Sequence, residues 1–267
     1  MGKEKKIGVI QFPGSNCESE TVAAITYYGM SASLLHWSTS ESDFFKYDGF
    51  VIPGGFSFQD RIRAGVIASR LPIMNFIVRA SEKRYPILGI CNGCQILAES
   101  GLVPDLSENQ TIEMALAPNQ KNGEPLGFYC DWVFVKPTTP HQNIFTRLFE
   151  TNDVIPVPVN HGEGRFIFNS VEMLPYSSFQ YCDEDGKLSS SFPTNPNGTT
   201  HNIAGIGNKN GNVFAMMPHP ERAYLSRQIP DSIPGDWPQK KAAFFCNEAN
   251  APGPWEKLFL ALKEHER

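Results

Sequence analysis

The chain has 267 residues, of which 41% are hydrophobic and 19% are charged, and its formal net charge at pH 7 is -5. This length can bury a proper hydrophobic core, and this composition is that of an ordinary globular protein. A weakly acidic chain offers no electrostatic footprint for nucleic acid, and no apolar run approaches the roughly 18 residues that a membrane-spanning helix needs. The charged N-terminus gives no signal peptide, and the six cysteines show no disulfide-like spacing. We therefore expect a cytoplasmic protein with no nucleic-acid or membrane partner.

Strand-like and helix-like segments alternate along the first hundred residues. The apolar runs predict strands at 6–12, 32–37, 49–53 and 86–90. The segments between them predict helices at 17–29, 41–46, 60–70 and 73–84. This alternation predicts an α/β fold with an open, doubly wound, mostly parallel sheet that has helices on both faces. Ligands of such sheets bind at the carboxyl ends of the strands.

The pattern changes after residue 101, where short strand-like runs are separated by turns. We expect added antiparallel strands near 111–116, 128–136, 154–160, 165–168, 177–182, 203–207 and 213–217. The proline-rich stretch 229–254 is predicted to be an irregular surface excursion that precedes a last helix at 255–263. No internal repeat is present, and we interpret residues 1–267 as one domain.

Cys91 lies where a predicted strand runs directly into a predicted helix. Gly89 and Gly93 flank it as Gly-x-Cys-x-Gly, the sulfur version of a nucleophile elbow, in which small neighbours permit a strained turn. The N-terminal amides of the following helix would favour the thiolate form of the sulfur. This pattern predicts a cysteine nucleophile.

A cysteine nucleophile needs a base within hydrogen-bond reach, and the base needs a third group to orient it. His219 and Glu221 stand two residues apart in a proline-stiffened segment after a predicted strand, which makes Cys91, His219 and Glu221 a candidate catalytic triad. The alternative is a histidine that packs in a loop while Glu221 pairs with Arg222 or solvent. Both readings stay open from this segment alone.

Acyl transfer also needs donors for the oxyanion that forms on the attacked carbonyl. We expect the backbone amide of Asn92, the residue after the nucleophile, to be one donor. The amide of Gly55, in a glycine pair after another predicted strand, is the second candidate. A simple tight turn at Gly55 is the alternative.

Two other interpretations of the cysteine region compete with the nucleophile. Cys91 and Cys94 form a Cys-x-x-Cys pair that could be a redox dithiol, although Cys94 is better explained as a small buried side chain. A structural zinc site would need a second pair of ligands, and none is present, so we expect no metal. No dinucleotide or phosphate loop occurs either, so no cofactor is expected in this chain.

The segments Gly89-Ile-Cys-Asn-Gly-Cys-Gln95 and Pro218-His-Pro-Glu221 resemble those of class I glutamine amidotransferases, which have a flavodoxin-like sheet. Further segments resemble the glutaminase component of phosphoribosylformylglycinamidine synthase, a purine-pathway enzyme. They are Gly14-Ser-Asn-Cys-Glu18, Pro53-Gly-Gly-Phe-Ser57 continuing to Arg63-Ala-Gly65, His161-Gly-Glu-Gly-Arg165 and Asn195-Pro-Asn-Gly198. The motifs span residues 7 to 225 in the expected order.

This resemblance implies that Cys91 attacks the side-chain amide of glutamine and that His219 handles the protons. It also implies that Gln95 and Phe56 help to bind glutamine. The released ammonia would pass to a separate synthetase subunit that uses ATP and magnesium to make formylglycinamidine ribonucleotide, with a small accessory subunit as a further partner. Another amidotransferase, a γ-glutamyl hydrolase and a non-catalytic interaction subunit are the alternatives.

Some features of the chain depart from this family. Phe58-Gln59 stands where Tyr-Gly is usual, close to the second oxyanion donor. Extra material lies around 105–127 and 229–254, and partner contacts are its only expected role. The segment His161–Arg165 could bind substrate, face the synthetase or be a plain hairpin turn.

Overall fold

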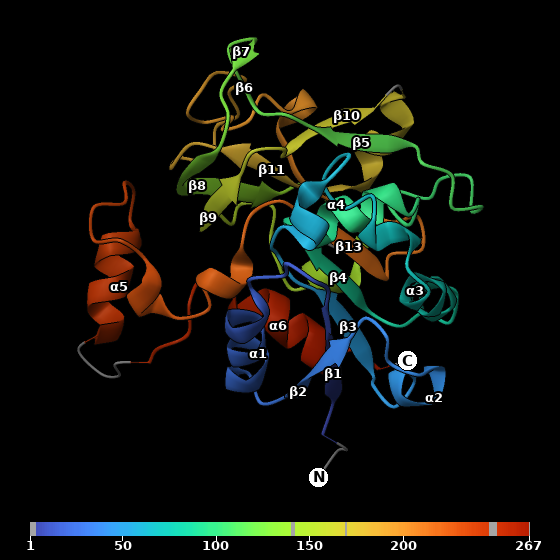
Figure 1. Cartoon of the computed structure of the whole chain (residues 1–267). Coiled ribbons are helices and arrows are strands. Elements are labelled where there is room, and N and C mark those ends of the chain that lie inside the picture. The colour runs from blue at the N-terminus through green and yellow to red at the C-terminus, as the bar shows by residue number, and fades with distance from the viewer. Residues whose placement is uncertain (1–3, 140–141, 169, 246–249, 267) are drawn as a thin grey trace.

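A nine-stranded sheet organises the protein in the computed structural model, which describes residues 4–139, 142–168, 170–245 and 250–266 (Figure 1). In their order across the sheet the strands are β2 (Ser31–His36), β1 (Lys6–Gln11), β3 (Gly49–Ile52), β4 (Ile87–Ile90), β13 (Val213–Met216), β12 (Ile203–Gly207), β11 (Ser177–Cys182), β8 (Tyr129–Pro137) and β9 (Ile155–His161). The pairings from β2 to β13 are parallel, and those from β13 to β9 are antiparallel. The predicted α/β fold is confirmed.

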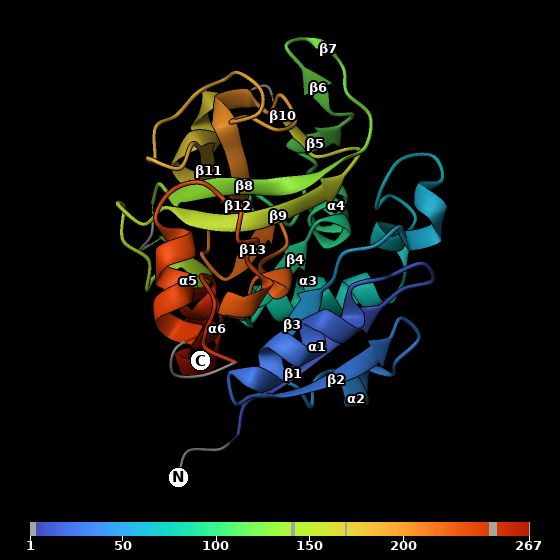
Figure 2. The ribbon, with the colours of Figure 1, turned by 90° about the vertical axis from the view of Figure 1, so that its left-hand side faces the viewer.

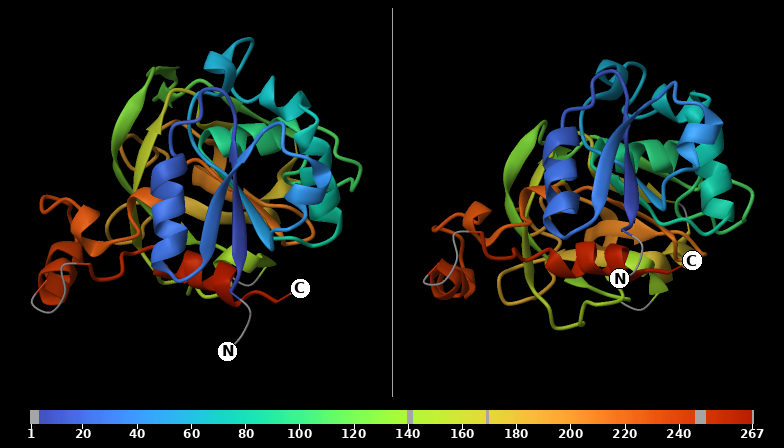
Figure 3. Two further views of the ribbon diagram at one scale, coloured as in Figure 1. Left: turned by 60° about the horizontal axis from the view of Figure 1, so that its bottom comes forward. Right: turned by 90° about the horizontal axis from the view of Figure 1, so that it is seen from below.

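Helices connect the parallel strands, as the alternating pattern predicts. They are α1 (Glu18–Tyr27), α2 (Glu41–Phe44), α3 (Ile73–Glu82) and α4 (Asn92–Glu99), and the chain ends with α6 (Glu256–Glu264). Apolar residues on one face of α3 are buried, as expected for an amphipathic helix against a sheet. Figure 3 shows α1 and α6 close together, and the rings of Tyr28 and Phe259 stack there with centroids 5.2 Å apart.

β13 corrects one sequence-based expectation. The run 213–217 was expected to be one of the added antiparallel strands, but β13 pairs in parallel with β4 and only its other edge is antiparallel to β12. All four residues of β13 are buried, which fits a strand in the middle of a sheet. The remaining antiparallel strands of the sheet follow the prediction.

The helix predicted at 60–70 is wrong. This stretch forms a short 3₁₀ turn at Ser57–Asp60, an irregular segment and a second 3₁₀ turn at Ala68–Arg70. Left-handed backbone explains the difference, because φ is +60° at Gln59, +74° at Ile62 and +80° at Gly65. A right-handed helix cannot pass through such residues.

Two smaller sheets lie beside the main one. β5 (Met114–Ala117) pairs with β10 (Arg165–Phe168), and β6 (Gln120–Lys121) pairs with β7 (Glu124–Pro125). The β6–β7 hairpin was not predicted, and it lies inside the extra segment 105–127.

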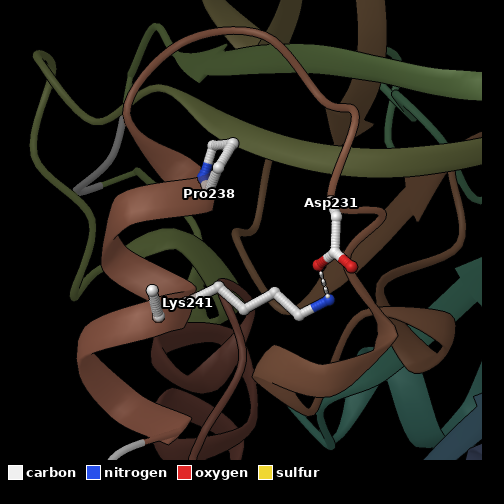
Figure 4. Close-up of a pocket in the computed structure, with 4 residues that line it drawn as sticks. Asp231, Pro238 and Lys241 are labelled. Atoms are coloured by element: carbon white, nitrogen blue, oxygen red, sulfur yellow. Dashed lines mark hydrogen bonds and ion pairs between the residues drawn. The ribbon is translucent and has the colours of Figure 1, made fainter.

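The segment 229–254 was predicted to be irregular, but it contains the helix α5 (Trp237–Phe245), which stands at the left edge of Figure 1. Trp237 links this helix to the rest of the protein, because its Nε1 donates to the Val154 carbonyl at 3.1 Å. Lys241 and Asp231 form an ion pair at 2.7 Å beside a pocket of about 260 Å³ (Figure 4). Among the described residues, no helix is both long and apolar enough to cross a membrane.

Candidate active site

The motif segments lie at the carboxyl ends of three adjacent parallel strands. β3, β4 and β13 are neighbours, and Gly54, Cys91 and His219 follow them respectively. This is the edge at which doubly wound sheets bind their ligands. β9 also reaches this edge, because the Pro158 carbonyl accepts a hydrogen bond from the His219 amide at 2.9 Å. Figure 2 shows β8 and β9 running across the molecule above the parallel strands.

Cys91 occupies a sharp turn between β4 and α4. Its φ of +52° and ψ of -104° lie outside the ordinary regions for a non-glycine residue. The glycines around it are sterically required, because a Cβ at Gly93 would overlap the Ile52 carbonyl and one at Gly89 would lie 2.6 Å from the Gly93 oxygen. The turn predicted from Gly-x-Cys-x-Gly is therefore present, and it places the sulfur at the N-terminus of α4.

His219 and Glu221 form a buried pair. His219 Nδ1 lies 2.6 Å from Glu221 Oε1, and both side chains are almost completely buried. Burial opposes protonation of the ring, but the Glu221 carboxylate and then the Cys91 sulfur outweigh it and raise the pKa of His219 well above its usual value. The alternative, in which Glu221 pairs with Arg222 or solvent, does not fit, because Glu221 is buried against His219 and Arg222 pairs with Glu20.

Cys91 and His219 meet on either side of one glycine. A Cβ at Gly54 would lie 2.7 Å from His219 Cε1 and 3.4 Å from Cys91 Cβ, so only a residue without a side chain fits between them. His219 Nε2 makes no hydrogen bond within the described part of the chain. The nitrogen that Glu221 does not engage is thus available to the sulfur or to a substrate.

Through its contact with His219, Glu221 should affect how the free energy of unfolding depends on pH. Because the folded pKa of His219 lies above the unfolded value of about 6.5, the protonated ring contributes stability that is complete below that pH. This contribution is lost as the pH rises through the folded pKa. In Glu221→Gln the folded pKa falls, so we expect unfolding free energy to decline less steeply above about pH 6.5 than in the wild type.

Urea unfolding between about pH 6 and pH 9 measures this slope. Glu18→Gln is the control, because Glu18 is a buried carboxylate that accepts from Gln11 Nε2 at 3.1 Å and is far along the chain from the His219–Glu221 pair. The control should keep the wild-type slope. Equal slopes in all three proteins would refute the electrostatic link between Glu221 and His219.

Cys17 is a neighbour of the triad that sequence analysis missed. Its sulfur lies 4.0 Å from His219 Nδ1 and accepts from Arg222 Nη2 at 3.1 Å. Burial raises the pKa of the Cys17 thiol, so the thiol form is favoured. The sequence signal that could have identified Cys17 was its position in the Gly14–Glu18 motif, after the first strand.

Cys17, His219 and Glu221 are also the described residues that could hold a metal ion, with ligand atoms within 4.8 Å of one another. The Arg222 guanidinium beside Cys17 opposes a cation there, because like charges repel. That this chain needs no metal stays a prediction.

A cavity of about 210 Å³ opens in front of Cys91. It is lined by Gly55, Phe56, Asp60, Cys91, Gln95, Phe128, Asn160, His161, Gly162 and Glu163. The predicted binding residues Phe56 and Gln95 both lie in this wall. Phe56 is 43% exposed at the rim, whereas Gln95 is buried and donates to the Glu163 carbonyl at 2.7 Å. Gln95 is therefore no ordinary surface residue of α4.

The two candidate oxyanion donors, the amides of Asn92 and Gly55, stay predictions. Asn92 begins α4, so its amide has no helical carbonyl to bond with. Gly55 lines the cavity and forms a bridge with Ser15 that uses the Gly54 carbonyl and the Phe56 amide. The amide of Gly55 takes no part in the hydrogen bonds of this bridge.

Cys94 is fully buried one helical turn after Cys91. Burial raises the pKa of its thiol well above the usual value, which makes it a poor thiolate. The structure therefore disfavours a redox pair with Cys91. Five cysteines among the described residues are free, and Cys246 lies outside them.

Residues 4–264 match the family of CobB/CobQ-like glutamine amidotransferase domains. Phosphoribosylformylglycinamidine synthase subunit PurQ of Methanothrix thermoacetophila is 41% identical over 250 residues, which cover 88% of this chain and 94% of the relative. The chain belongs to the PurQ family of glutamine amidotransferases. Within this family, PurQ of Pyrococcus horikoshii is 44% identical over 218 residues, or 82% of this chain and 89% of the relative.

One solved structure supports the same family. The structure of PurLQS from Thermotoga maritima has a TM-score of 0.70 and 30% identity, and the match covers 91% of this chain and 100% of that chain. The resemblance predicted from the motifs is thereby confirmed. The match to the family over residues 4–264 includes the elbow at Cys91 and the His219 segment.

Proposed function

We propose that this chain is the glutaminase subunit of a phosphoribosylformylglycinamidine synthase. It hydrolyses glutamine to glutamate and ammonia and supplies the ammonia to an ATP-dependent synthetase subunit in purine biosynthesis. The placement of Cys91 and His219 around Gly54, with Glu221 behind the imidazole, is the observation that carries this proposal. The similarity to PurQ subunits along most of the chain supports it independently.

The first half of the reaction forms a thioester. The Cys91 sulfur attacks the side-chain carbonyl carbon of glutamine, and a new C–S bond forms. The imidazolium of His219 gives its proton to the amide nitrogen as the C–N bond breaks, and ammonia leaves. Glu221 stabilises the imidazolium through the 2.6 Å contact with Nδ1.

The second half regenerates the enzyme. His219, now neutral, takes a proton from a water molecule that attacks the thioester carbonyl. The C–S bond then breaks and glutamate leaves. His219 keeps the proton, so the protonated imidazole and the free Cys91 sulfur are restored. In both halves the carbonyl oxygen becomes negative, and the amides of Gly55 and Asn92 are the proposed donors to it.

The cavity suits a free amino acid. Its volume of about 210 Å³ is several times the roughly 30 Å³ that one water occupies. Asp60 and Glu163 line it, and burial, followed by the charge of Glu163, raises the pKa of Asp60 to about 6. Two carboxyl groups at this wall would stabilise the α-ammonium of glutamine. Gln95 and Phe56 are the other proposed binding residues.

The remaining chemistry belongs to partners. ATP and magnesium are expected on the synthetase subunit, and the similar PurLQS structure supports a complex with such a subunit. A small accessory subunit and a cytoplasmic location stay predictions.

Coupling between the subunits tests this function. The isolated chain should hydrolyse glutamine slowly, because uncoupled ammonia release wastes substrate, and adding the synthetase subunit should raise turnover severalfold or more. Glutamate release, measured with and without the partner, checks this. Unchanged turnover would contradict the coupling, and no glutamate in either case would favour a non-catalytic interaction subunit. Hydrolysis of γ-glutamyl peptides in preference to glutamine would favour a γ-glutamyl hydrolase.

A further inference from the structure

Asn119 lies in the extra segment 105–127, to which neither the sequence nor the proposed function assigns a role. Its side chain is 1% exposed and makes four polar contacts. Nδ2 donates to the carbonyls of Gly127 at 3.0 Å and His161 at 2.7 Å. Oδ1 accepts from the Gly164 amide at 2.9 Å and lies 3.2 Å from His161 Nδ1. Its backbone amide also donates to the Gly162 carbonyl at 2.8 Å.

These contacts hold in place a turn that forms one wall of the cavity in front of Cys91. His161, Gly162 and Glu163 line that cavity, and Asn119 bonds to the residues at both ends of the turn. Asn197 supports the same turn from outside, since its Nδ2 donates to the Gly164 carbonyl at 2.7 Å. The Asn195–Gly198 motif therefore has a structural role, which is to support this turn.

The orientation of the Asn119 amide fixes where His161 carries its proton. Two carbonyls accept from Nδ2 and a backbone N–H donates to Oδ1, so the amide cannot be reversed without placing like partners together. Oδ1 is therefore an acceptor, and His161 Nδ1 must be the donor across the 3.2 Å contact.

The other nitrogen of this imidazole is then free of a proton. Burial, and then the charge of His219, lower the pKa of His161 to about 3, so the ring is neutral. Its Nε2 is buried and makes no hydrogen bond within the described residues. A neutral ring with Nδ1–H has a lone pair on Nε2.

We propose that Asn119 is a positioning residue of the glutamine site. It closes the turn His161–Gly164 against the cavity and holds His161 in the tautomer with the proton on Nδ1. Asn119 touches no reacting atom, so its effect on the reaction passes through the cavity wall. This inference rests on the proposed function, because it concerns how the same cavity holds its substrate.

Steady-state kinetics of the full chain with its synthetase subunit test the proposal. In Asn119→Ala the cavity wall loses the hydrogen bonds that hold it. We expect KM for glutamine to rise about tenfold, which is the effect of one or two lost buried hydrogen bonds, while kcat changes little. Asn212→Ala is the matched control. Asn212 is equally buried and donates to the carbonyls of Ser81 and Tyr85, both at 2.9 Å, at the opposite end of β13.

A general loss of stability would affect both variants, whereas a positioning role raises KM in Asn119→Ala alone. Equal KM values in the two variants would overturn the proposal. If Asn119→Ala fails to fold, Asn197→Ala takes its place, because it removes a donor to the Gly164 carbonyl of the same turn and leaves Asn119 intact. It should raise KM less than tenfold.

Nitrogen NMR of histidine gives a readout that does not depend on activity. In the wild type His161 should show a protonated Nδ1 and an unprotonated Nε2, with the signal assigned by its loss in His161→Gln. Asn119→Ala should shift the ring toward the other tautomer, whereas Asn197→Ala, which leaves Asn119 Oδ1 in place, should keep the wild-type tautomer. A wild-type ring protonated on Nε2 would refute the inference even if glutamine hydrolysis is confirmed, whereas a wild type without glutaminase activity would instead refute the proposed function.

Discussion

Cys91→Ala should abolish glutamine-dependent synthesis and leave ammonia-dependent synthesis intact. We expect glutamine hydrolysis to fall by about 10⁴-fold or more, because no other group can form the thioester. The synthetase subunit would still accept free ammonia, so activity with an ammonium salt should match that of the wild-type complex. Parallel assays of the reconstituted complex, with glutamine or with ammonium as nitrogen donor, measure both quantities.

Cys94→Ala is the control for this substitution. Cys94 is fully buried one turn later in α4, so its loss leaves a small cavity without touching the cavity in front of Cys91. Glutamine-dependent synthesis should survive in this variant. If Cys91→Ala kept glutamine-dependent synthesis, or if Cys94→Ala lost it to the same extent, Cys91 would not be the nucleophile.

His219→Ala should have the second largest effect, a loss of about 10²- to 10⁴-fold in glutamine turnover. The loss has two causes. The leaving nitrogen no longer receives a proton, and no base activates the water that attacks the thioester. KM should change much less than kcat, because the interaction is made mainly in the transition state. Rates of glutamate release across a glutamine series check this.

His36→Ala is the control for the histidine. His36 is an exposed residue at the end of β2, and its Nδ1 contacts only Ser38 among the described side chains. Its loss should leave glutamine turnover unchanged. A His219→Ala enzyme that kept most of the wild-type kcat would show that another base serves Cys91.

Local patterns in the sequence were enough to predict the groups that we propose to react. Cys91 stands between glycines at a strand-to-helix junction, and His219 and Glu221 stand two residues apart after a strand. In each case neighbouring residues set the backbone that aims the side chain. Three adjacent parallel strands then bring these segments to one edge, which follows from the predicted α/β alternation.

Contacts between distant segments were beyond this kind of reasoning. The Asn160 carbonyl lies 3.7 Å from the Cys91 sulfur although 69 positions separate the two residues, because the edge strand β9 crosses the site. Asn119 and His161 meet across 42 positions, and no local pattern marks such a pair. Cys17 reaches His219 in the same way.

The wrong helix at 60–70 has a different cause. Its composition is compatible with a helix, but residues 57–65 follow the Gly54-Gly55 pair and pack against α4. Gly65 packs so closely there that a Cβ would lie 2.7 Å from the Ile96 amide nitrogen. Arg63 then pairs through two nitrogens with the buried Glu99 of α4. Tertiary contacts therefore set the backbone of this segment against its helical tendency.

Covalent labelling tests the account most directly, because the account requires one sulfur to react with a carbonyl-like centre on glutamine. The full chain is treated with an electrophilic glutamine analogue and digested, and each cysteine-containing peptide is examined by mass spectrometry. The adduct should lie on Cys91, free glutamine should protect it, and His219→Ala should slow its formation. An adduct on the exposed Cys130 with Cys91 unmodified would contradict the proposed reaction.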